Sequence, residues 1–269
     1  MTGQTSSTIS TKDGLTAALE AAIVGGRLTP GTKLPSEREM AERHRVSRPA
    51  VREAIRGLVE RDLLEVVPGR GAFVRHARSS DAATRMDTLL RRQQPTPRHM
   101  VEARLALEGT TAALAAERAE AADLTAIAAA LDAFDEADGL LEQVRHDLAF
   151  HLAVARAAHN PVVETMFLAI AGLTAELMLR SLADPLTPPA SLPYHRAVFD
   201  AIRDKTPGRA RQAMTDHLQV AARTYGADFD RSLESVARRE LVRLLDPEVG
   251  LDALLAVLPA AAEAADGHP

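Results

Sequence analysis

The sequence predicts a mainly α-helical protein of two domains: a small helix-turn-helix domain with a β-hairpin, joined to a larger all-α helical bundle. Three observations lead to this prediction. The chain of 269 residues exceeds the usual size of one domain. Two short helical patterns, separated by about four residues, precede a short hairpin pattern. From about residue 98 onward nearly every segment has helical composition, with no convincing strand.

The composition limits the classes of function and of site. The chain has no cysteine, which excludes disulfides, thiolate catalysis and cysteine-ligated zinc. Histidine and carboxylate side chains are then the metal ligands that remain. There is no run of about eighteen apolar residues and no signal-peptide pattern, so we expect a cytoplasmic protein without a membrane span.

Charge is distributed unequally along the chain. Residues 1–78 contain 13 Lys and Arg against 9 Asp and Glu, a net charge of +4, whereas the remainder carries 19 against 28, or −9. A basic N-terminal part favours a polyanionic partner. Solvated charged faces are common, however, so this asymmetry needs a motif to support it.

The N-terminal part contains the signals of a helix-turn-helix. Residues 1–11 are rich in Ser and Thr, and we expect a disordered lead there. A first helix is predicted over Asp13–Gly25. Ser36, with Glu39 three residues later, forms a capping-box pattern that predicts a second helix, and Ser47 is the N-cap candidate of a third.

The third helix and the hairpin carry a row of basic residues. Arg48, Arg52 and Arg56 lie four residues apart and share one helix face, which can offer guanidinium groups to phosphates and guanine edges in a major groove. Arg38 can reach the DNA backbone, and Arg70 at the hairpin tip can enter the minor groove. The alternative is a solvated arginine face. The order of caps, turn, arginine row and basic hairpin favours a winged helix-turn-helix over residues 12–77.

The remainder divides into three segments. Periodicity is lost over residues 78–97, which predicts a linker. Residues 98–229 predict about six helices. Their breaks are at Gly139, at Asn160-Pro161, in the Pro-rich "DPLTPPASLP" and at Thr206-Pro207-Gly208. Residues 230–269 form a C-terminal extension of unknown role, with room for two more short helices.

Four side chains of the helical part form a candidate metal site. Asp147 and His151 in "DLAFH" are four residues apart, so both lie on one helix face. His195 and His217 are spaced with apolar neighbours and are expected to point toward the core. These side chains either converge as a site of three nitrogens and one oxygen in a helical bundle or form separate hydrogen-bonded core histidines. Spacing alone leaves both interpretations open.

Two further histidines are not expected to be ligands. His146 lies on an adjacent helix face, about 100° from Asp147, and is expected to be exposed. His159 precedes Asn160-Pro161 and is expected at a helix end. The candidate site therefore has four members.

The N-terminal motifs resemble a known family. The string "LTPGTKLPSEREMAERHRVSRPAVREAIRGLVERDLLEVVPGRGAFV" is similar to the DNA-binding domain of GntR-type bacterial transcription regulators. The resemblance implies that Arg38, Arg48 and Arg52 contact DNA and that the Gly69–Gly71 wing tip touches the minor groove. The sequence departs from the family in two places: His44-Arg45 replaces the usual aromatic-glycine pair, and Asp62 stands where glycine is frequent. The full set of expected DNA contacts is Arg38, Ser47, Arg48, Arg52, Arg70 and Gly71.

The second part resembles the FCD effector domain of the FadR subfamily, an antiparallel helical bundle. The blocks "MVEARLALEGTTAALAAERA", "DLAFHLAVARAAHNPVV", "YHRAVFDAI" and "ARQAMTDHL" carry this resemblance over about residues 98–225. It implies a divalent metal held by Asp147, His151, His195 and His217. It also implies that Arg104 faces the cavity and pairs with the effector's carboxylate.

Together these features predict a metabolite-responsive transcription regulator that is not an enzyme. We expect a homodimer on a pseudo-palindromic operator, acting as a repressor, with a small organic acid as effector. Zn²⁺ is the first expectation for the metal, with Ni²⁺ or Mn²⁺ as alternatives. Two rival hypotheses are a metal-dependent hydrolase-like enzyme and a constitutive repressor with a purely structural metal. The effector, the operator and the regulated genes do not follow from the sequence.

Overall fold

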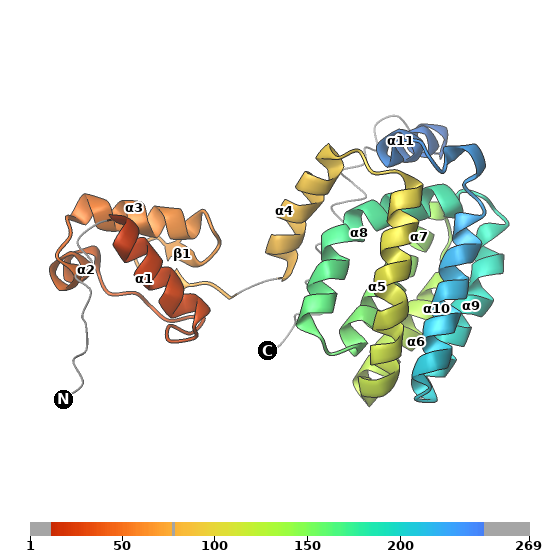
Figure 1. The fold of residues 1–269 in the computed structure, drawn as a ribbon, viewed down its shortest axis with the longest axis horizontal. Coiled ribbons are helices and arrows are strands. Elements are labelled where there is room, and N and C mark those ends of the chain that lie inside the picture. Colours follow the sequence, from red (N-terminus) through yellow and green to blue (C-terminus); the bar gives the residue numbers. More distant parts are fainter. Residues whose placement is uncertain (1–11, 77–78, 245–269) are drawn as a thin grey trace. The chain divides into compact units, whose positions relative to one another are not determined.

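The protein divides into two compact units, residues 1–81 and residues 82–269, called here the N-terminal unit and the helical unit. The computed structural model describes residues 12–76 and 79–244. The lead predicted over residues 1–11 and the part of the C-terminal extension beyond residue 244 lie outside the described residues. Figure 1 shows the helical elements of both units.

The N-terminal unit is a helix-turn-helix followed by a β-hairpin. Its elements are α1 (Lys12–Val24), α2 (Glu37–His44), α3 (Arg48–Val59), β1 (Leu64–Val67) and β2 (Gly71–Val74). The strands are antiparallel, with Leu64 opposite Val74 and Val67 opposite Gly71. Apolar residues from every element form one core: Leu15, Leu19, Leu34, Met40, Val51, Ala54, Leu58, Leu64 and Val74. The predicted winged helix-turn-helix is confirmed.

The caps of α2 and α3 fix the turn between them. Ser36 and Glu39 form both hydrogen bonds of a capping box, and the Ser47 side chain accepts from the backbone of Ala50. Arg45 ends α2 with φ of 55°, and Asp62 follows α3 with φ of 59°. Both departures from the family pattern are therefore at left-handed positions, the conformation for which glycine is favoured.

The helical unit has the six predicted helices between residues 97 and 222. They are α5 (Pro97–Arg118), α6 (Ala121–Asp135), α7 (Leu140–Ala157), α8 (Pro161–Leu182), α9 (Thr187–Arg203) and α10 (Pro207–Ala222). α5 and α9 pack against α10, and α7 packs against both α6 and α8. The predicted breaks at Gly139, Asn160 and Thr206 separate these helices, and the Asn160 side chain caps α8.

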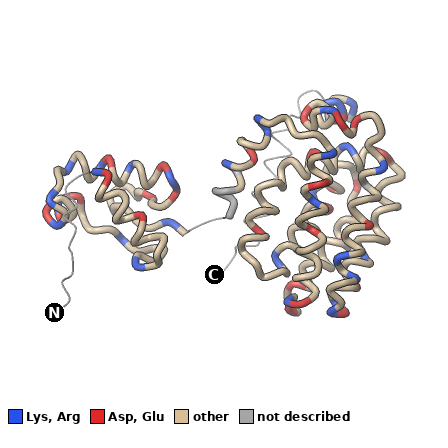
Figure 2. Tube along the Cα trace, viewed as in Figure 1, with Lys and Arg blue, Asp and Glu red and all other residues tan. Residues whose placement is uncertain are grey.

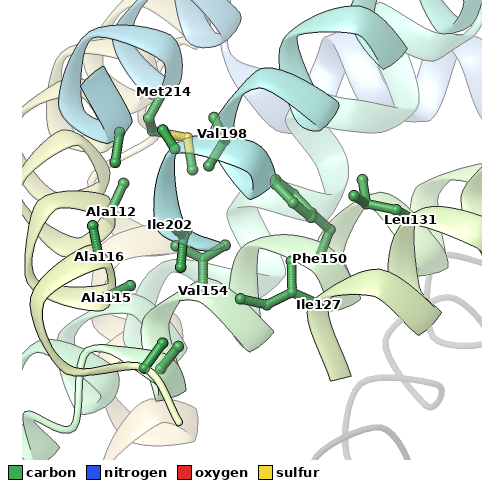
Figure 3. Close-up of a cluster of buried hydrophobic side chains, with 14 of the residues drawn as sticks. Ala112, Ala115, Ala116, Ile127, Leu131, Phe150, Val154, Val198, Ile202 and Met214 are labelled. Carbon is green, nitrogen blue, oxygen red and sulfur yellow. The ribbon is translucent and has the colours of Figure 1, made fainter. Parts of the chain in front are cut away.

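A core of alanines and larger apolar side chains holds this bundle together. Ala112, Ala115 and Ala116 of α5 allow close approach of α10, which contributes Met214. Phe150 and Val154 of α7 close the other side, and Figure 3 shows these side chains meeting in one cluster. Burial on this scale is the main stabilising contribution to a helical bundle.

Two boundaries differ from the prediction. The segment predicted as a linker is largely helical, because α4 spans Ser79–Arg92. Arg91 of α4 pairs with Asp87 and with the buried carboxylate of Glu176 on α8, so tertiary contacts compensate for the weak periodicity of α4. α9 begins at Thr187, inside the Pro-rich stretch, because proline is compatible with the first turn of a helix.

The C-terminal extension adds one described helix, α11 (Leu233–Leu244), which packs against α8. Leu233 is fully buried, and its backbone donates to the carbonyl of Pro95 at 2.8 Å. Just before the helix, Asp230 accepts two hydrogen bonds from Arg98, at 2.7 and 2.9 Å. The extension therefore fastens the beginning of α5 to α8.

Of the described helices, only α8 is long and apolar enough to span a membrane by length and composition. An 18-residue stretch of α8 has a mean hydropathy of 1.7, and 56% of that stretch is buried inside the protein. A buried core helix of a soluble protein has the same properties, so this is weak evidence for a membrane span.

Candidate metal centre and nucleic-acid surface

Four buried side chains from three helices converge in the helical unit. Asp147 and His151 come from α7, His195 from α9 and His217 from α10. One candidate ligand atom of each lies within 4.8 Å of all the others. We call this group the histidine–aspartate cluster. The structure therefore brings together all four predicted ligands.

The individual distances show how close the ligand atoms are. Nε2 of His151 lies 3.1 Å from Nε2 of His217 and 3.5 Å from Oδ1 of Asp147. Nε2 of His195 lies 2.9 Å from the same Asp147 oxygen. Phe150 packs its ring edge against the rings of both His151 and His195 and excludes water from one side.

The polar atoms of this cluster are not paired as in an ordinary hydrogen-bond network. Oδ1 of Asp147, both ring nitrogens of His195 and Nδ1 of His217 are buried and lack a hydrogen-bond partner among the described residues. Nε2 of His195 lies 2.9 Å from Oδ1 of Asp147, so these two atoms face each other directly. Buried polar atoms without partners need an explanation, and three imidazoles with one carboxylate fit a first-row divalent metal.

A second carboxylate orients one of the histidines. Glu108 of α5 is buried, and its Oε2 contacts Nδ1 of His151, while its Oε1 accepts from Nε of Arg104 at 2.5 Å. A hydrogen bond from Nδ1–H to a carboxylate leaves the lone pair of Nε2 facing the cluster, which is the usual arrangement around metal-binding histidines. Glu108 thus links His151 to Arg104.

The electrostatics agree with this geometry at Asp147, His195 and His217, but they differ at His151. Burial lowers the pKa of His151, yet the charge of Glu108 and the hydrogen bonds of Asp147 and Glu108 outweigh burial and raise it. Burial alone would raise the pKa of Glu108, but the charges of Arg104 and His151 outweigh burial and hold the pKa at about 2. Burial would also raise the pKa of Asp147, yet the neighbouring histidines, above all His195, hold it well below its usual value. Burial lowers the pKa values of His195 and His217 and favours the neutral imidazoles that bind metals.

Arg104, the predicted effector contact, lies beside this cluster. It is buried, and its Nη2 lies 3.1 Å from Nε2 of His151. Glu108, its principal partner, was missed in the sequence. The signal was present, because Glu108 lies four residues after Arg104 and therefore shares its helix face.

The two histidines not predicted as ligands are outside the cluster. His146 is partly buried rather than exposed, and it contacts Arg145 at 3.0 Å. His159 lies just beyond the end of α7, as expected, and pairs with Asp123 at 2.7 Å.

The predicted DNA-contacting residues lie on the surface of the N-terminal unit. Arg48, Arg52 and Arg56 are exposed along α3, and Figure 2 shows the basic residues of this unit in blue. Arg52 pairs with Glu37 at 2.7 Å, and Arg38 on α2 pairs with Glu42 at 3.3 Å. Such exposed pairs are weak and can be exchanged for phosphate contacts.

The hairpin tip has the shape of a wing. Gly69 and Gly71 have φ values of 73° and 109°, so both need the conformational freedom of glycine. Arg70 between them is exposed, with its guanidinium 5.4 Å from the ring centre of Phe73. The tip therefore presents a basic residue beyond the strands.

These features define a class of protein. A DNA-binding unit with exposed arginines is joined to a helical unit with a buried ligand cluster. Proteins built in this way are metabolite-responsive transcription regulators. Residues 11–74 match the family of bacterial regulatory proteins described as the gntR family, and residues 99–220 match the FCD domain family. The chain belongs to the GntR family of transcription regulators, in the FadR-like group that carries an FCD domain.

Named relatives support this assignment. The chain is 34% identical to the galactonate operon transcriptional repressor of Escherichia coli K12 over 80% of this chain and 97% of that protein. It is 31% identical to the transcriptional regulator LutR of Bacillus subtilis 168 over 79% of this chain and all of that protein. A GntR structure from Streptococcus agalactiae has a similar fold, with a TM-score of 0.57 at 24% identity over 79% of this chain and 99% of that one.

Proposed function

We propose that the helical unit senses a small organic carboxylate at a divalent metal held by the histidine–aspartate cluster, and that this changes operator binding by the N-terminal unit. The observation that carries the proposal is the convergence of four ligand side chains within 4.8 Å beside the buried guanidinium of Arg104. A ligand can shift operator affinity only if its affinity differs between two arrangements of the protein. The protein acts in the cytoplasm as a homodimeric repressor.

The metal would be held by Asp147, His151, His195 and His217, with Zn²⁺ as the first choice and Ni²⁺ or Mn²⁺ as alternatives. When bound, it would supply a Lewis acid that attracts a carboxylate or hydroxyl oxygen of the effector. Glu108 fixes the orientation of His151, and the low pKa of Asp147 keeps that side chain ionised at neutral pH.

Arg104 would recognise the carboxylate of the effector. Its guanidinium is oriented by Glu108 and lies against His151, so a carboxylate bound there is also next to the metal ligands. A planar guanidinium suits carboxylate recognition, because it can form two parallel hydrogen bonds.

The N-terminal unit would bind the operator through two surfaces. α3 would enter the major groove with Arg48 and Arg52, while Arg38 and Ser47 contact phosphates. Arg70 and Gly71 of the wing would reach the minor groove. One such helix reads few bases, so a twofold dimer on a pseudo-palindrome is needed for specificity.

Two relatives are named as repressors, which supports repression as the proposed direction of regulation. The name of the Escherichia coli relative states that it represses a galactonate operon. Another relative, from Klebsiella aerogenes, is named as the transcriptional repressor NanR, at 27% identity. Two related proteins from Escherichia coli are named as activators of the Glc operon, so the direction of regulation needs its own measurement.

The proposal is tested by measuring metal content and operator release together. An operator is first selected by the purified protein from random duplex DNA, and carboxylates are then screened for release by fluorescence anisotropy. We expect about one metal ion per chain in the wild type, and loss of both metal and release in a His195→Asn, His217→Asn double variant. His159→Asn is the matched control, because His159 lies outside the cluster and pairs with Asp123.

The Arg104→Lys variant distinguishes a metal that takes part in effector sensing from a metal that only stabilises the fold. Lysine keeps the positive charge beside Glu108 but lacks the planar fork, so we expect metal content to persist while carboxylate-induced release weakens at least about tenfold. Unchanged release would favour a structural metal in a constitutive repressor. Conversion of a carboxylate by the metal-loaded protein would favour an enzyme instead.

A further inference from the structure

Exposed basic side chains of the N-terminal unit differ in whether they have an acidic partner. Arg38, Arg52 and Arg56 each pair with a glutamate. Lys33 and Arg45 are also exposed, but neither side chain has a hydrogen bond or an ion pair with another described residue. A basic group without a carboxylate partner can bind an anion without first breaking a contact.

Arg45 occupies a backbone position that an arginine does not favour. It ends α2 with φ of 55° and ψ of 41°, which is the left-handed helical region. A Cβ atom crowds the backbone there, so glycine is the usual residue at such a helix end. The family pattern also has glycine at this place. The chain thus keeps an arginine here at a cost in conformational free energy, and its side chain requires an explanation.

Other non-glycine residues in left-handed conformations use their side chains within the fold. Besides Arg45, the described residues include four of them. Three make a side-chain contact each: Asp62 with Arg75, His159 with Asp123, and Lys205 with the carbonyl of Ala119. The fourth, Gln94, is uncharged. Among these described residues, only Arg45 places a charge at such a position without a partner, which points to a partner outside the protein.

The place of Arg45 in the chain indicates what that partner is. Arg45 lies two residues before Ser47, the N-cap of α3, and three before Arg48. In a helix-turn-helix the first helix crosses the DNA backbone, and the second enters the major groove with its N-terminal residues. The turn between them therefore lies at the edge of the groove, where the phosphates are. A basic side chain in this turn is suited to a phosphate.

Lys33 lies beside the wing, the other structure expected to approach DNA. The segment before α2 runs along β2, and the backbone N–H of Leu34 donates to the carbonyl of Ala72 at 2.8 Å. Cε of Lys33 is so close to Gly71 that a Cβ atom on Gly71 would lie 3.3 Å from it. The aliphatic stem of Lys33 therefore crosses Gly71, and its ammonium group, one bond further, lies beside the wing tip that carries Arg70.

We propose that Lys33 and Arg45 bind DNA phosphates at two edges of the operator-reading surface, Lys33 beside the wing and Arg45 beside the beginning of α3. This inference rests on the proposed operator binding by the N-terminal unit. Phosphate contacts carry no sequence information, so the two side chains add affinity for any duplex and position the base-reading arginines of α3. The compact charge of a lysine and the planar group of an arginine both suit a phosphate.

The test removes each charge and keeps the local structure. Lys33→Met retains an apolar stem over Gly71, and Arg45→Gly suits the left-handed backbone. The full-length variants are titrated by fluorescence anisotropy with the selected operator and with a random duplex, between about 0.05 and 0.4 M potassium chloride. Each lost phosphate contact should lower the slope of log affinity against log salt by about 0.9, or about eightfold in affinity per tenfold change in salt. The reduction should be equal on both duplexes.

Arg61→Met is the charge-matched control, because Arg61 pairs with Glu20 beyond the C-terminal end of α3, and it should leave the slope unchanged. Arg45→Gly should also keep or raise the melting temperature, and a lower one would show that Arg45 acts in folding. An unchanged slope, or a reduction on the operator alone, would overturn the assignment of the residue concerned. If the wild type binds no duplex, the proposed operator binding fails as well.

Discussion

Arg52 of α3 and Arg104 of α5 each form an ion pair with a glutamate, but in opposite environments. The Arg52 side chain is 67% exposed in its pair with Glu37, whereas Arg104 is 3% exposed in its pair with Glu108. At the surface, water solvates either partner when the other leaves, so the pair is weak and exchangeable. In the interior, loss of one partner leaves a buried charge, so the pair is fixed.

This difference matches the two tasks proposed for the units. A DNA-binding surface has to exchange its carboxylate partners for phosphates, and exposed pairs allow this at small free-energy cost. An effector site has to remain formed before the ligand arrives, and buried pairs hold the guanidinium in place. Substitutions that break buried and exposed ion pairs test this contrast.

The largest effect is expected for the buried pair. Glu108→Gln leaves the guanidinium of Arg104 without a carboxylate, and we expect the free energy of unfolding to fall by about 3–5 kcal/mol in the metal-free protein. Urea denaturation followed by circular dichroism measures this. Arg104→Met should cost less than Glu108→Gln, because Glu108 then keeps His151 as its partner.

The double variant provides the control for that prediction. When Arg104→Met and Glu108→Gln are combined, no buried charge of the pair remains, so the loss should be clearly smaller than the sum of the two single losses. If the two losses of unfolding free energy were additive, the two side chains would act independently. The contrast between this buried pair and the exposed pair of Arg52 would then disappear.

An intermediate effect is expected at Asp228, which accepts hydrogen bonds from Arg180 and Arg239 and is mostly buried. The bond from Arg239 is the main cause that holds the pKa of Asp228 at about 2, below its usual 3.8. A lowered pKa stabilises the folded state above the usual value, and the stabilisation is lost as the pH falls toward 2. Asp228→Asn should therefore cost about 2 kcal/mol at pH 7 and progressively less between pH 4 and pH 2.

Asp135→Asn is the matched control. Asp135 pairs with Arg196, but both side chains are about half exposed. Its substitution should change stability little at any pH. An equal loss in both variants would show that burial of Asp228 has no special effect.

The smallest effect on stability is expected at the DNA-binding surface. Glu37→Gln breaks the exposed pair with Arg52, and we expect a change below about 1 kcal/mol in the free energy of unfolding. Operator affinity should rise a few-fold, because a competitor for Arg52 and a negative charge near the phosphates are both removed. Fluorescence anisotropy at two salt concentrations measures it. Glu234→Gln, which breaks the exposed pair with Arg238 on α11, should leave operator affinity unchanged.

Much of the fold follows from local sequence signals. The capping box at Ser36, the N-cap at Ser47 and the break at Asn160 all have the predicted structure, because each depends on neighbouring residues. The helix α4 was not predicted, because Arg91 finds its carboxylate on Glu176, 85 residues away in the sequence. Contacts of that range are not visible in local periodicity.

At the candidate site, too, contacts between residues far apart in the sequence could not be predicted from local patterns. Asp147 and His151 are four residues apart and share a helix face, so their proximity could be predicted from the sequence. Their convergence with His195 and His217 could be predicted only from the family resemblance, and it is seen in the helical bundle. Glu108 was missed because its contact with His151 crosses from α5 to α7.

The contacts of the C-terminal segment determine where a fragment containing the helical unit can end. The match to the FCD family ends at residue 220, yet Tyr225 and Leu233 are buried against α5 and α8, and Asp230 holds Arg98. A fragment that ended at residue 220 would expose apolar side chains of α5 and α8 to water. The smallest effector fragment suitable for crystallography or ligand screening should therefore run to Leu244, and a protease site or a fusion partner belongs beyond that residue.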